Sequence, residues 1–535
     1  MVARGKAKFE DVLDIIGHNG CMQWIIVLFS IAQESSVGLV IYFLVFAESK
    51  TPSWTCDAVL SGNVTTTVLG GGNSSINGFS GYLLNSTQDV CPLTSCSNIT
   101  YDVGYTSIVT EWGLICDKQY FAKMTVSLVL LGMGLGTIVA GQLADMFGRR
   151  KVILGSWALV MIFHSSLGFM PSYPIYIIFR ILGAMAAGSI ASISCVLPSE
   201  YVGPKGRVVV SLRMGWRVGA YVITGLAFGI REWRHLAFAC GLFFLPLFPV
   251  ACFLMPESAR WSIQKGRFEE AMYWLKMIAR FNRKPCPDME LLQEIAGAEN
   301  KEKQELRRYT YIDLFKGKEY ALRTFLLTFS WFSLSLNEYG LVTMTSSLTG
   351  GVYTNMALMT TFNLFVRSSA MIVLNIKWIG RKRGFALYTS FAVLCTVTVM
   401  ILELTGYTKN NQMAKTWLVI ATFGGMSGAW SSCFLFAQEL YPSLLRGLAT
   451  SIGNIAIRIG GVIAPQIVLL GDVHPSLTFI ILGSFNAVSV ILVLLFIPET
   501  LKTPLPEDLP PKKWKRKVAG SASENEEMID KEMAD

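Results

Sequence analysis

Charge is the scarcest feature of this 535-residue sequence. Only 16% of its residues are charged and 52% are hydrophobic, whereas a soluble domain is about 25% charged. The hydrophobic residues gather in twelve runs of about 20 residues, and each run is long enough to cross a bilayer as a helix. The low charge and the long runs together exclude a soluble enzyme, a nucleic-acid-binding protein and a disordered scaffold.

Residues that carry catalytic chemistry are also few. The four histidines, His18, His164, His235 and His474, are scattered and lack metal-ligand spacing, and no Walker A motif for ATP is present. We find no set of nucleophile, base and orienting group. The sequence therefore predicts no metal, no cofactor and no enzymatic activity, and transport by this chain is expected to be secondary.

The apolar runs predict a multi-pass membrane protein. The first run carries Glu34 and spans about 26 residues, too many for a signal-peptide core of about 7–15 residues, so we retain it as a span. The predicted spans are 21–46, 123–143, 152–170, 175–197, 208–230, 235–255, 322–342, 353–378, 384–404, 415–438, 447–470 and 476–498.

Positive charge is concentrated in short loops and in the C-terminal tail. The clusters are Arg149, Arg150 and Lys151; Arg381, Lys382 and Arg383; and Lys512, Lys513, Lys515, Arg516 and Lys517. Since short Lys/Arg-rich loops face the cytoplasm, both termini are predicted to be cytoplasmic. The predicted parts are a cytoplasmic N-terminus (1–20), a six-helix half (21–255), a cytoplasmic linker (256–321) with amphipathic helices such as 267–280, a second half (322–498) and a disordered cytoplasmic tail (499–535).

The loop 47–122 is predicted to be extracellular and glycosylated. Its sequons lie at Asn63, Asn73, Asn85 and Asn98, and its cysteines are Cys56, Cys91, Cys96 and Cys116. Sequons have meaning only outside the cytoplasm, and four cysteines in an oxidising compartment predict two disulfides in one of three pairings. Chance sequons and free thiols are the alternative.

Three motifs occur twice along the chain. GQLADMFGRRK (141–151) is echoed by KWIGRKRG (377–384), SEYVGPKGR (199–207) by QELYPSLLRG (438–447), and PESARW (256–261) by PETLKT (498–503). The pairs lie about 240 residues apart in the same order, which indicates a duplicated six-span unit. Two such halves that rock about a midplane site are the build of major facilitator transporters.

These motifs also carry a family resemblance. GQLADMFGRRK is similar to the major facilitator signature G-x-L-x-D-R-x-G-R-R-K, with Met146 in place of an Arg. TSIVTEWGLIC (106–116), PESARW, ELYPSLLR (439–446) and PETLKTPLPEDL (498–509) resemble the organic cation/anion/zwitterion transporter family, and its anion branch most. The resemblance implies an all-α membrane protein with twelve transmembrane helices in two pseudo-symmetric six-helix halves, located in the plasma membrane. The family typically has six cysteines in the first loop, whereas this chain has four.

The resemblance further implies a conformational latch on the cytoplasmic side. Its candidate residues are Asp145, Arg149, Arg150, Glu439 and Arg446. Met146 weakens one charge contact of this latch.

Five charged residues are predicted to lie near the middle of the bilayer. They are Glu34, Arg217, Glu338, Arg367 and Arg458, about 15–22 Å from the cytoplasmic ends of their spans at 1.5 Å per residue. A charge at this depth costs at least about 2.5–3.5 kcal/mol and needs a partner or a wet cavity. The surplus of arginines favours an anionic substrate. The alternative is structural pairing of Arg458 with Glu338 and of Arg367 with Glu34.

The family comparison predicts the charge of the substrate. Arg458 matches a position where organic anion transporters carry Arg and organic cation transporters carry Asp, although zwitterion transporters also keep the Arg. Arg367 matches a Lys of anion transporters, and Asn363 replaces a usual Glu. These matches favour a small organic anion. The resemblance implies exchange against an intracellular dicarboxylate, although no residue of the sequence names the counter-substrate. Because Glu338 replaces a common Tyr, ion-coupled transport of carnitine-like zwitterions or of cations stays open, with Glu338 or Glu34 as the cation partner.

The remaining predicted substrate-binding residues are aromatic or polar. They are Trp430, Phe434, Tyr339, Phe228, Asn363 and Gln33. Aromatic rings give shape-tolerant contacts to amphiphilic substrates, and Trp430 and Phe434 share one helical face. For each of these residues the alternative is packing against lipid or hydrogen bonding between helices. The expected partners are the substrate, an exchanged dicarboxylate or coupled ion, and the bilayer. A non-transporting receptor or channel on the same fold is the alternative from another class.

Overall fold

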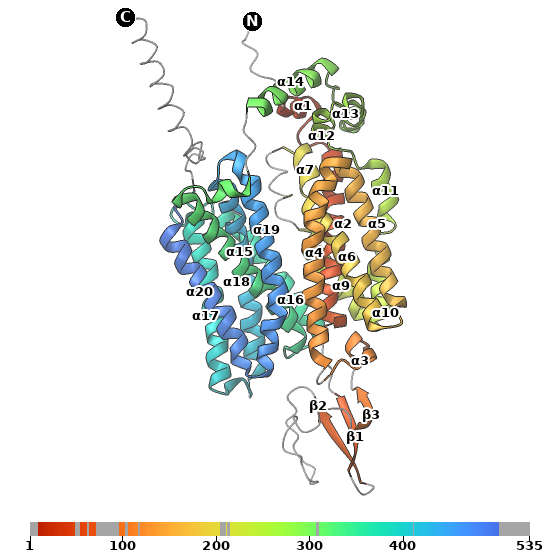
Figure 1. Ribbon diagram of the computed structural model, residues 1–535, viewed down its shortest axis with the longest axis vertical. Helices are drawn as coiled ribbons and strands as arrows, with labels where there is room; N and C mark the ends of the chain where they lie inside the picture. Colours follow the sequence, from red (N-terminus) through yellow and green to blue (C-terminus); the bar gives the residue numbers. More distant parts are fainter. Residues whose placement is uncertain are drawn as a thin grey trace, which may run out of the picture.

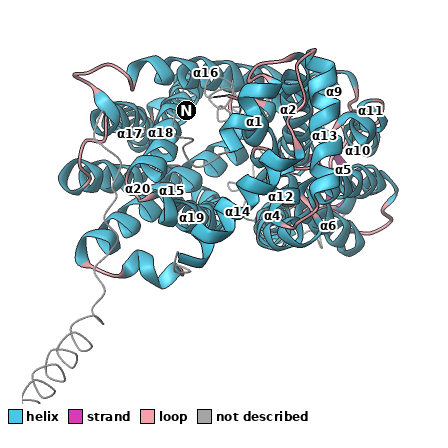
Figure 2. Ribbon diagram, turned by 90° about the horizontal axis from the view of Figure 1, so that it is seen from above, coloured by secondary structure: helices cyan, strands magenta, loops and turns pink. Residues whose placement is uncertain are grey.

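The protein consists of two helical bundles that lie side by side (Figures 1 and 2). The computed structural model describes residues 9–48, 54–60, 64–70, 96–101, 105–115, 118–203, 210, 214–305, 310–409 and 411–501. The cysteines Cys91 and Cys116, the sequons at Asn63, Asn73 and Asn85, and the tail from residue 502 lie outside these ranges.

The N-terminal bundle, here the N-half, is built from long apolar helices. They are α2 (Cys21–Phe43), continued by the π-helix η1 (Leu44–Glu48), α4 (Gln119–Phe147), α5 (Arg149–Ser166), α6 (Tyr173–Ile193), the short α7 (Val196–Tyr201), α9 (Gly215–Gly229), α10 (Trp233–Leu242) and α11 (Leu247–Leu254).

The C-terminal bundle, here the C-half, repeats this pattern. It contains α15 (Lys318–Met344), α16 (Val352–Val373), α17 (Gly380–Leu404), α18 (Gln412–Glu439), α19 (Ser443–Leu469) and α20 (Pro475–Phe496).

Ten helical segments among the described residues are long and apolar enough to cross a membrane. The two predicted spans missing from this set are α9, which is described over only 15 residues, and α15, whose 27 residues include many polar side chains. Both helices pack within the bundles beside the other ten (Figure 1). The membrane part therefore has the predicted all-α architecture of twelve helices in two halves.

Each end of the molecule carries a distinct cap (Figure 1). At the linker end, α1 (Phe9–Ile16) lies with the linker helices α12 (Ala259–Gln264), α13 (Phe268–Asn282) and α14 (Met289–Glu305), while the 3-10 helix η5 (Tyr311–Phe315) precedes α15. The amphipathic segment predicted at 267–280 corresponds to α13. Asn282 at its end accepts a hydrogen bond from the Met22 N–H at 3.1 Å, which ties the linker to the start of α2.

At the opposite end, here the sheet end, the structure adds an element that the sequence analysis did not foresee. Strands β1 (Trp54–Leu60), β2 (Val64–Gly70) and β3 (Cys96–Tyr101) form an antiparallel sheet in the order β2-β1-β3. Cys56, Cys96 and Asn98 lie on these strands. The short α3 (Ile108–Trp112) connects the sheet region to α4.

Helices within the N-half pack at backbone contact. A Cβ atom on Gly136 of α4 would lie 1.9 Å from the Met185 carbonyl oxygen of α6, and one on Gly188 of α6 would lie 2.0 Å from the Met133 carbonyl oxygen. Only glycine permits this approach, as in other small-residue interfaces of membrane helices. The close packing makes the N-half a tight unit.

The two halves meet through α4 and α19 and through α9 and α16. Ser127 Oγ donates to the Val462 carbonyl at 2.7 Å, and the Tyr221 and Thr361 hydroxyls lie 2.7 Å apart. Phe46 stacks on Tyr353 with ring centroids 5.6 Å apart. All three contacts join segments on the sheet side of their helices, so the halves are closed against each other at the sheet end.

Candidate functional site: a charged cavity between the halves

A cavity lies where the two halves face each other at mid-height. Its lining comes from α2 and α9 of the N-half and from α15, α16, α18 and α19 of the C-half. The lining residues are Ile41, Tyr42, Trp216, Arg217, Glu338, Tyr339, Val342, Arg367, Trp430, Phe434, Asn454, Ile457 and Arg458.

Three arginines and one glutamate give the cavity an excess of positive charge. Arg217 comes from the N-half, and Arg367 and Arg458 come from two different helices of the C-half. The Arg458 guanidinium lies 3.3 Å from the Met133 sulfur of α4, so it reaches across to the N-half. Both arginines predicted to hold the substrate's anionic group therefore share one cavity.

The carboxylate in the cavity pairs with a different arginine from the one expected. Glu338 Oε1 lies 3.6 Å from Arg217 Nη2, whose other terminal nitrogen donates to the Tyr42 hydroxyl at 2.9 Å. The sequence analysis considered a structural pair of Glu338 with Arg458; the structure pairs Glu338 with Arg217, because α9 and α15 bring these two residues together across the boundary between the halves.

An aromatic wall closes one side of the cavity. Trp430 and Phe434 stack with centroids 5.8 Å apart, and Trp331 meets both rings edge-on from behind. Trp430 is 5% exposed, and its indole N–H has no hydrogen-bond partner within the part of the chain that the structure describes. A buried donor without a partner is uncommon in proteins.

Four residues predicted to bind substrate lie outside the lining. Gln33 is buried and donates to the Met255 sulfur at 3.4 Å, and Asn363 accepts from the Ser427 hydroxyl at 2.9 Å between α16 and α18. Glu34 is buried where α2 meets α6, with the Cys195 sulfur 3.0 Å away. Phe228 is 66% exposed and touches Tyr353 edge-on.

These four residues lie outside the cavity lining for a geometric reason. One residue turns a helix by about 100°, so a shift of one or two positions moves a side chain from the cavity to a helix interface. Gln33 and Asn363 bridge helices, which is the alternative considered for them. Conversely, Tyr42 and Trp216 line the cavity although nothing in their sequence context separates them from packing aromatics.

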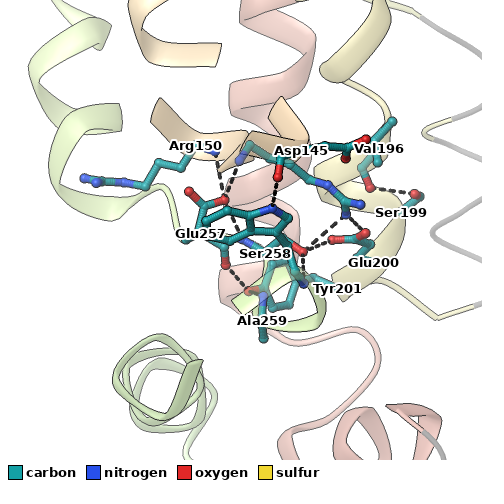
Figure 3. A network of polar contacts seen from close by, with 11 residues as sticks. Asp145, Arg150, Val196, Ser199, Glu200, Tyr201, Glu257, Ser258 and Ala259 are labelled. Atoms are coloured by element: carbon teal, nitrogen blue, oxygen red, sulfur yellow. Dashed lines mark hydrogen bonds and ion pairs between the residues drawn. The ribbon is translucent and has the colours of Figure 1, made fainter. Parts of the chain in front are cut away.

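A second polar network lies at the linker end of the N-half (Figure 3). Glu257 Oε1 accepts from the backbone N–H groups of Arg149 and Arg150 at 2.8 and 3.0 Å, at the first turn of α5. Arg149 forms an ion pair with Glu200 and donates to the Ser258 hydroxyl at 3.2 Å. A carboxylate at a helix N-terminus is stabilised by the helix dipole, although burial raises the pKa of Glu257 and those backbone bonds act against the rise.

The C-half repeats this network with equivalent residues. Glu499 accepts from the backbone N–H groups of Arg381 and Lys382 at 2.8 and 3.1 Å, at the first turn of α17. Arg381 pairs with Glu439 at 3.3 Å, and the Thr500 hydroxyl donates to Glu439. We call the two networks the twin clamps. Their acids Glu200, Glu257 and Glu499 were marked in the sequence only as parts of repeated motifs.

The predicted latch residues thus lie mainly within the clamps of single halves. Arg150 donates to the Met255 carbonyl at 2.8 Å and covers the Trp274 ring at 4.9 Å, and the Asp145 carbonyl accepts from the Trp261 indole at 3.0 Å. Arg446, at the start of α19, has two buried guanidinium nitrogens without a hydrogen-bond partner among the residues that the structure describes.

Comparisons with known proteins agree with this architecture. A family model described as "Sugar (and other) transporter" matches residues 21–507. Organic anion transporter 3 of Homo sapiens is 30% identical over 434 residues, which cover 80% of this chain and 75% of that protein. An organic cation transporter protein of Drosophila melanogaster is 29% identical over 436 residues, which cover 78% and 76%.

A solved structure supports the fold. The inward-open conformation of the xylose transporter XylE from E. coli aligns with a TM-score of 0.62 at 14% identity, over 91% of this chain and 99% of that one.

Proposed function

Because this chain belongs to the sugar (and other) transporter family and, within the major facilitator superfamily, to the organic cation/anion/zwitterion transporters, we propose that it carries small organic anions across the plasma membrane by alternating access. Transport of organic solutes follows from the family. The preference for anions, the exchange mode and a cytoplasmic location of both termini are the proposal.

The observation that carries the proposal is the charge of the central cavity. Arg217, Arg367 and Arg458 face one carboxylate, Glu338, in a space bounded by apolar helices. In such surroundings charges interact far more strongly than in water, so the surplus of guanidinium groups attracts an anion. Arginine also offers a planar fork that matches a carboxylate or sulfate.

The aromatic wall supports a substrate with an apolar body. The Trp430 and Phe434 rings offer a flat surface for a ring or chain, and the Trp430 N–H offers a donor. Aromatic contacts tolerate changes of shape. We expect a range of amphiphilic anions rather than one tightly fitted compound.

Alternating access is supported by where the halves touch. The contacts of Ser127 with Val462 and of Tyr221 with Thr361 close the sheet end, so the opposite conformation requires these contacts to separate. In that conformation the linker end closes, and Arg446 and Asp145 are the candidates for a latch between the halves.

Three substrates with the same ring and different charge test the proposal. The purified protein in liposomes is given labelled hippurate, phenylalanine or phenyltrimethylammonium, which carry a negative, zwitterionic or positive charge. We expect saturable uptake of hippurate in preference to the others. Arg458→Ala and Arg367→Ala are each expected to lower it at least about thirtyfold, the cost of removing one partner from a close charge pair.

Arg323→Ala serves as the control, because it removes a positive charge from the linker end of α15, where Arg323 pairs with the exposed Glu319. Its hippurate uptake should equal that of the unmodified protein. Hippurate uptake that is unchanged in both the Arg458 and Arg367 variants, at equal amounts of reconstituted protein, would disprove the site assignment.

Ion-coupled transport of zwitterions or cations is the second candidate, and the Glu338 carboxylate on the cavity wall favours it. It requires preferred uptake of phenylalanine or phenyltrimethylammonium and loss of that uptake in Glu338→Gln.

A further inference from the structure

A second cavity lies at the sheet end of the C-half. Its volume is about 540 Å³, within the range of about 300–1,000 Å³ that is usual for small-molecule sites. Its walls are the turn between α15 and α16, the end of α17 and the first turns of α18 and α20, and its lining is mostly hydroxyl, amide and charged side chains. All of these segments belong to one half, so this cavity is separate from the central one.

The N-half holds a filled counterpart of this cavity. There the Trp112 ring of α3 packs against the rings of Tyr173, Tyr176 and Trp233, with centroids 5.8, 5.3 and 5.5 Å away. The neighbouring Glu111 accepts from the Trp233 indole N–H at 2.7 Å. The segment that connects α2 with α4 therefore places an aromatic ring and a carboxylate between α6 and α10.

The internal repeat identifies the equivalent positions in the C-half. Counted along the chain from the paired acids of the twin clamps, the three ring partners of Trp112 correspond to Gln412, Lys415 and Pro475. All three line the second cavity. The connection between α15 and α16 is short, 345–351, and contains no equivalent of α3. Within the described part of the chain, the space that Trp112 fills in the N-half is thus matched by an open cavity in the C-half.

The walls of the second cavity indicate a polar ligand with balanced charge. Lys415 Nζ lies 2.6 Å from Glu403 Oε1, and the Thr408 hydroxyl donates to the other carboxylate oxygen at 2.9 Å. The remaining titratable side chain of the lining is His474, whose Nδ1 accepts from the Ser476 N–H at 3.3 Å, so its ring is neutral in this arrangement. The lining therefore presents one negative and one positive charge.

The burial of this ion pair favours a ligand with both charges. The side chains of Glu403 and Lys415 are 8% and 25% exposed. A ligand with a single charge would pair with one of them and leave the other without a partner, which is costly where water is scarce. A zwitterion gives each side chain a new partner. Lys415 also stays at the cavity wall, because its ammonium lies 5.6 Å from the centre of the Phe479 ring.

We propose that this cavity is a binding site for a small polar zwitterion of the amino-acid type, separate from the central cavity. Glu403 binds the ammonium group of the ligand and Lys415 binds its carboxylate. The hydroxyl groups of the lining, such as that of Thr349, face a polar side chain of the ligand.

Equilibrium binding of labelled serine to the purified protein in detergent tests this assignment. Unlabelled 3-hydroxypropanoate and ethanolamine serve as competitors, because they are serine without its amino group and serine without its carboxyl group. We expect saturable binding of serine and at least about tenfold weaker binding of each competitor, since each loses a hydrogen bond between charged groups. Competition by either compound as strong as that by unlabelled serine would overturn the zwitterion site.

Substitutions in the lining locate the bound serine. Glu403→Gln and Lys415→Met are each expected to weaken serine binding at least about tenfold. Thr405→Trp keeps the ion pair but fills part of the cavity with a ring, so its loss of binding decides where a charge variant does not elute as a single species. Glu319→Gln is the control, since it removes the carboxylate of an ion pair at the linker end of the same half. Its serine binding should equal that of the unmodified protein.

The central cavity is the alternative place for serine. Binding should therefore be unchanged in Arg458→Ala and in the presence of saturating hippurate. Loss of serine binding in Arg458→Ala, or its displacement by hippurate, would place serine in the central cavity and overturn the proposal. Two further results would also overturn it: the absence of saturable serine binding to the unmodified protein, and unchanged binding in the folded variants at Glu403, Lys415 and Thr405.

Discussion

At the scale of single residues, the most deeply buried charges lie outside the cavity. Arg180 and Glu48 form an ion pair at 2.6 Å with side-chain exposures of 1% and 0%, and Arg180 also donates to the Val40 carbonyl at 2.7 Å. Glu48 ends the π-helix after α2, and π-turns often mark functional or strained positions. Sequence reasoning missed the pair because both residues lie near the predicted ends of their spans, where charges are ordinary.

We expect Glu48→Gln to destabilise the protein by about 3–5 kcal/mol, because it leaves Arg180 buried without a counter-charge. Thermal unfolding of the purified protein in detergent measures the change. Glu319→Gln is the matched control, since Glu319 is 71% exposed and pairs with Arg323 within α15. Equal unfolding temperatures for the two variants would show that the buried pair contributes nothing.

Trp430→Phe isolates the contribution of the indole N–H on the aromatic wall. The variant keeps a ring but loses the unpartnered donor, so half-saturation for hippurate should rise by about two- to tenfold, the effect of one neutral hydrogen bond. Trp331→Phe is the control, because its N–H is also without a partner among the described residues but lies behind the wall. The same rise in both variants would argue against a contact of the Trp430 N–H with substrate.

At the scale of elements, the twin clamps show how the repeated motifs become structure. The glycine before α5 and that at the start of α17, Gly148 and Gly380, have φ of +103° and +66°. The turn at each glycine directs the backbone N–H groups of the residues that follow it toward the carboxylate of Glu257 or Glu499. The sequence reveals the repetition, but it does not reveal that an acid 100 or more residues away caps the helix.

We expect Glu257→Gln and Glu499→Gln each to lower stability by about 1–2 kcal/mol, since each removes a charge from a partly buried helix N-terminus. Glu269→Gln, in the first turn of α13, controls for the loss of one carboxylate in a linker helix. Thermal unfolding of the three variants provides the comparison. If Glu257→Gln and Glu499→Gln both unfold at the same temperature as Glu269→Gln, the twin clamps do not contribute to stability.

Much of the helix pattern is predictable, because an apolar run of about 20 residues has few alternatives to a membrane helix. The predicted span 476–498 corresponds to α20 (Pro475–Phe496). The span predicted at 235–255 divides into α10 and α11 near Pro246, which removes a backbone donor. The sheet was not predicted, since its strands lie in a polar loop whose cysteines and sequons dominated the interpretation.

The cavity is predictable in part for a related reason. Charged side chains within the membrane, such as Arg367, Arg458 and Glu338, must reach water or a charged partner. Because burying them in lipid costs free energy, their presence in a predicted span indicates a cavity or an ion pair. Gln33 and Asn363 are neutral and carry no cost of burying a charge, and each makes a hydrogen bond to a neighbouring segment instead of facing the cavity. Their position depends on helix rotation, which a single sequence does not fix.

At the scale of the whole molecule, the halves are expected to move as units about the cavity. The motion must separate α4 from α19 at the sheet end, where Ser127 donates to the Val462 carbonyl at 2.7 Å.

A disulfide between Ser127→Cys and Val462→Cys should therefore stop transport, because it holds the sheet end closed. Hippurate uptake before and after oxidation, and again after reduction, measures the effect. The single variants should transport normally under the same oxidation. Full uptake by the cross-linked protein would exclude separation of the halves at this point.

The contact between α4 and α6 leaves no room for a side chain larger than that of glycine at two positions. At Gly136 and Gly188 the partner backbone already occupies the volume of a methyl group, so even alanine would push the two helices apart. The displacement would reach the cavity through Met133, whose sulfur touches the Arg458 guanidinium. A single-nucleotide variant at either glycine is thus expected to alter substrate selection from a position that no substrate ever contacts.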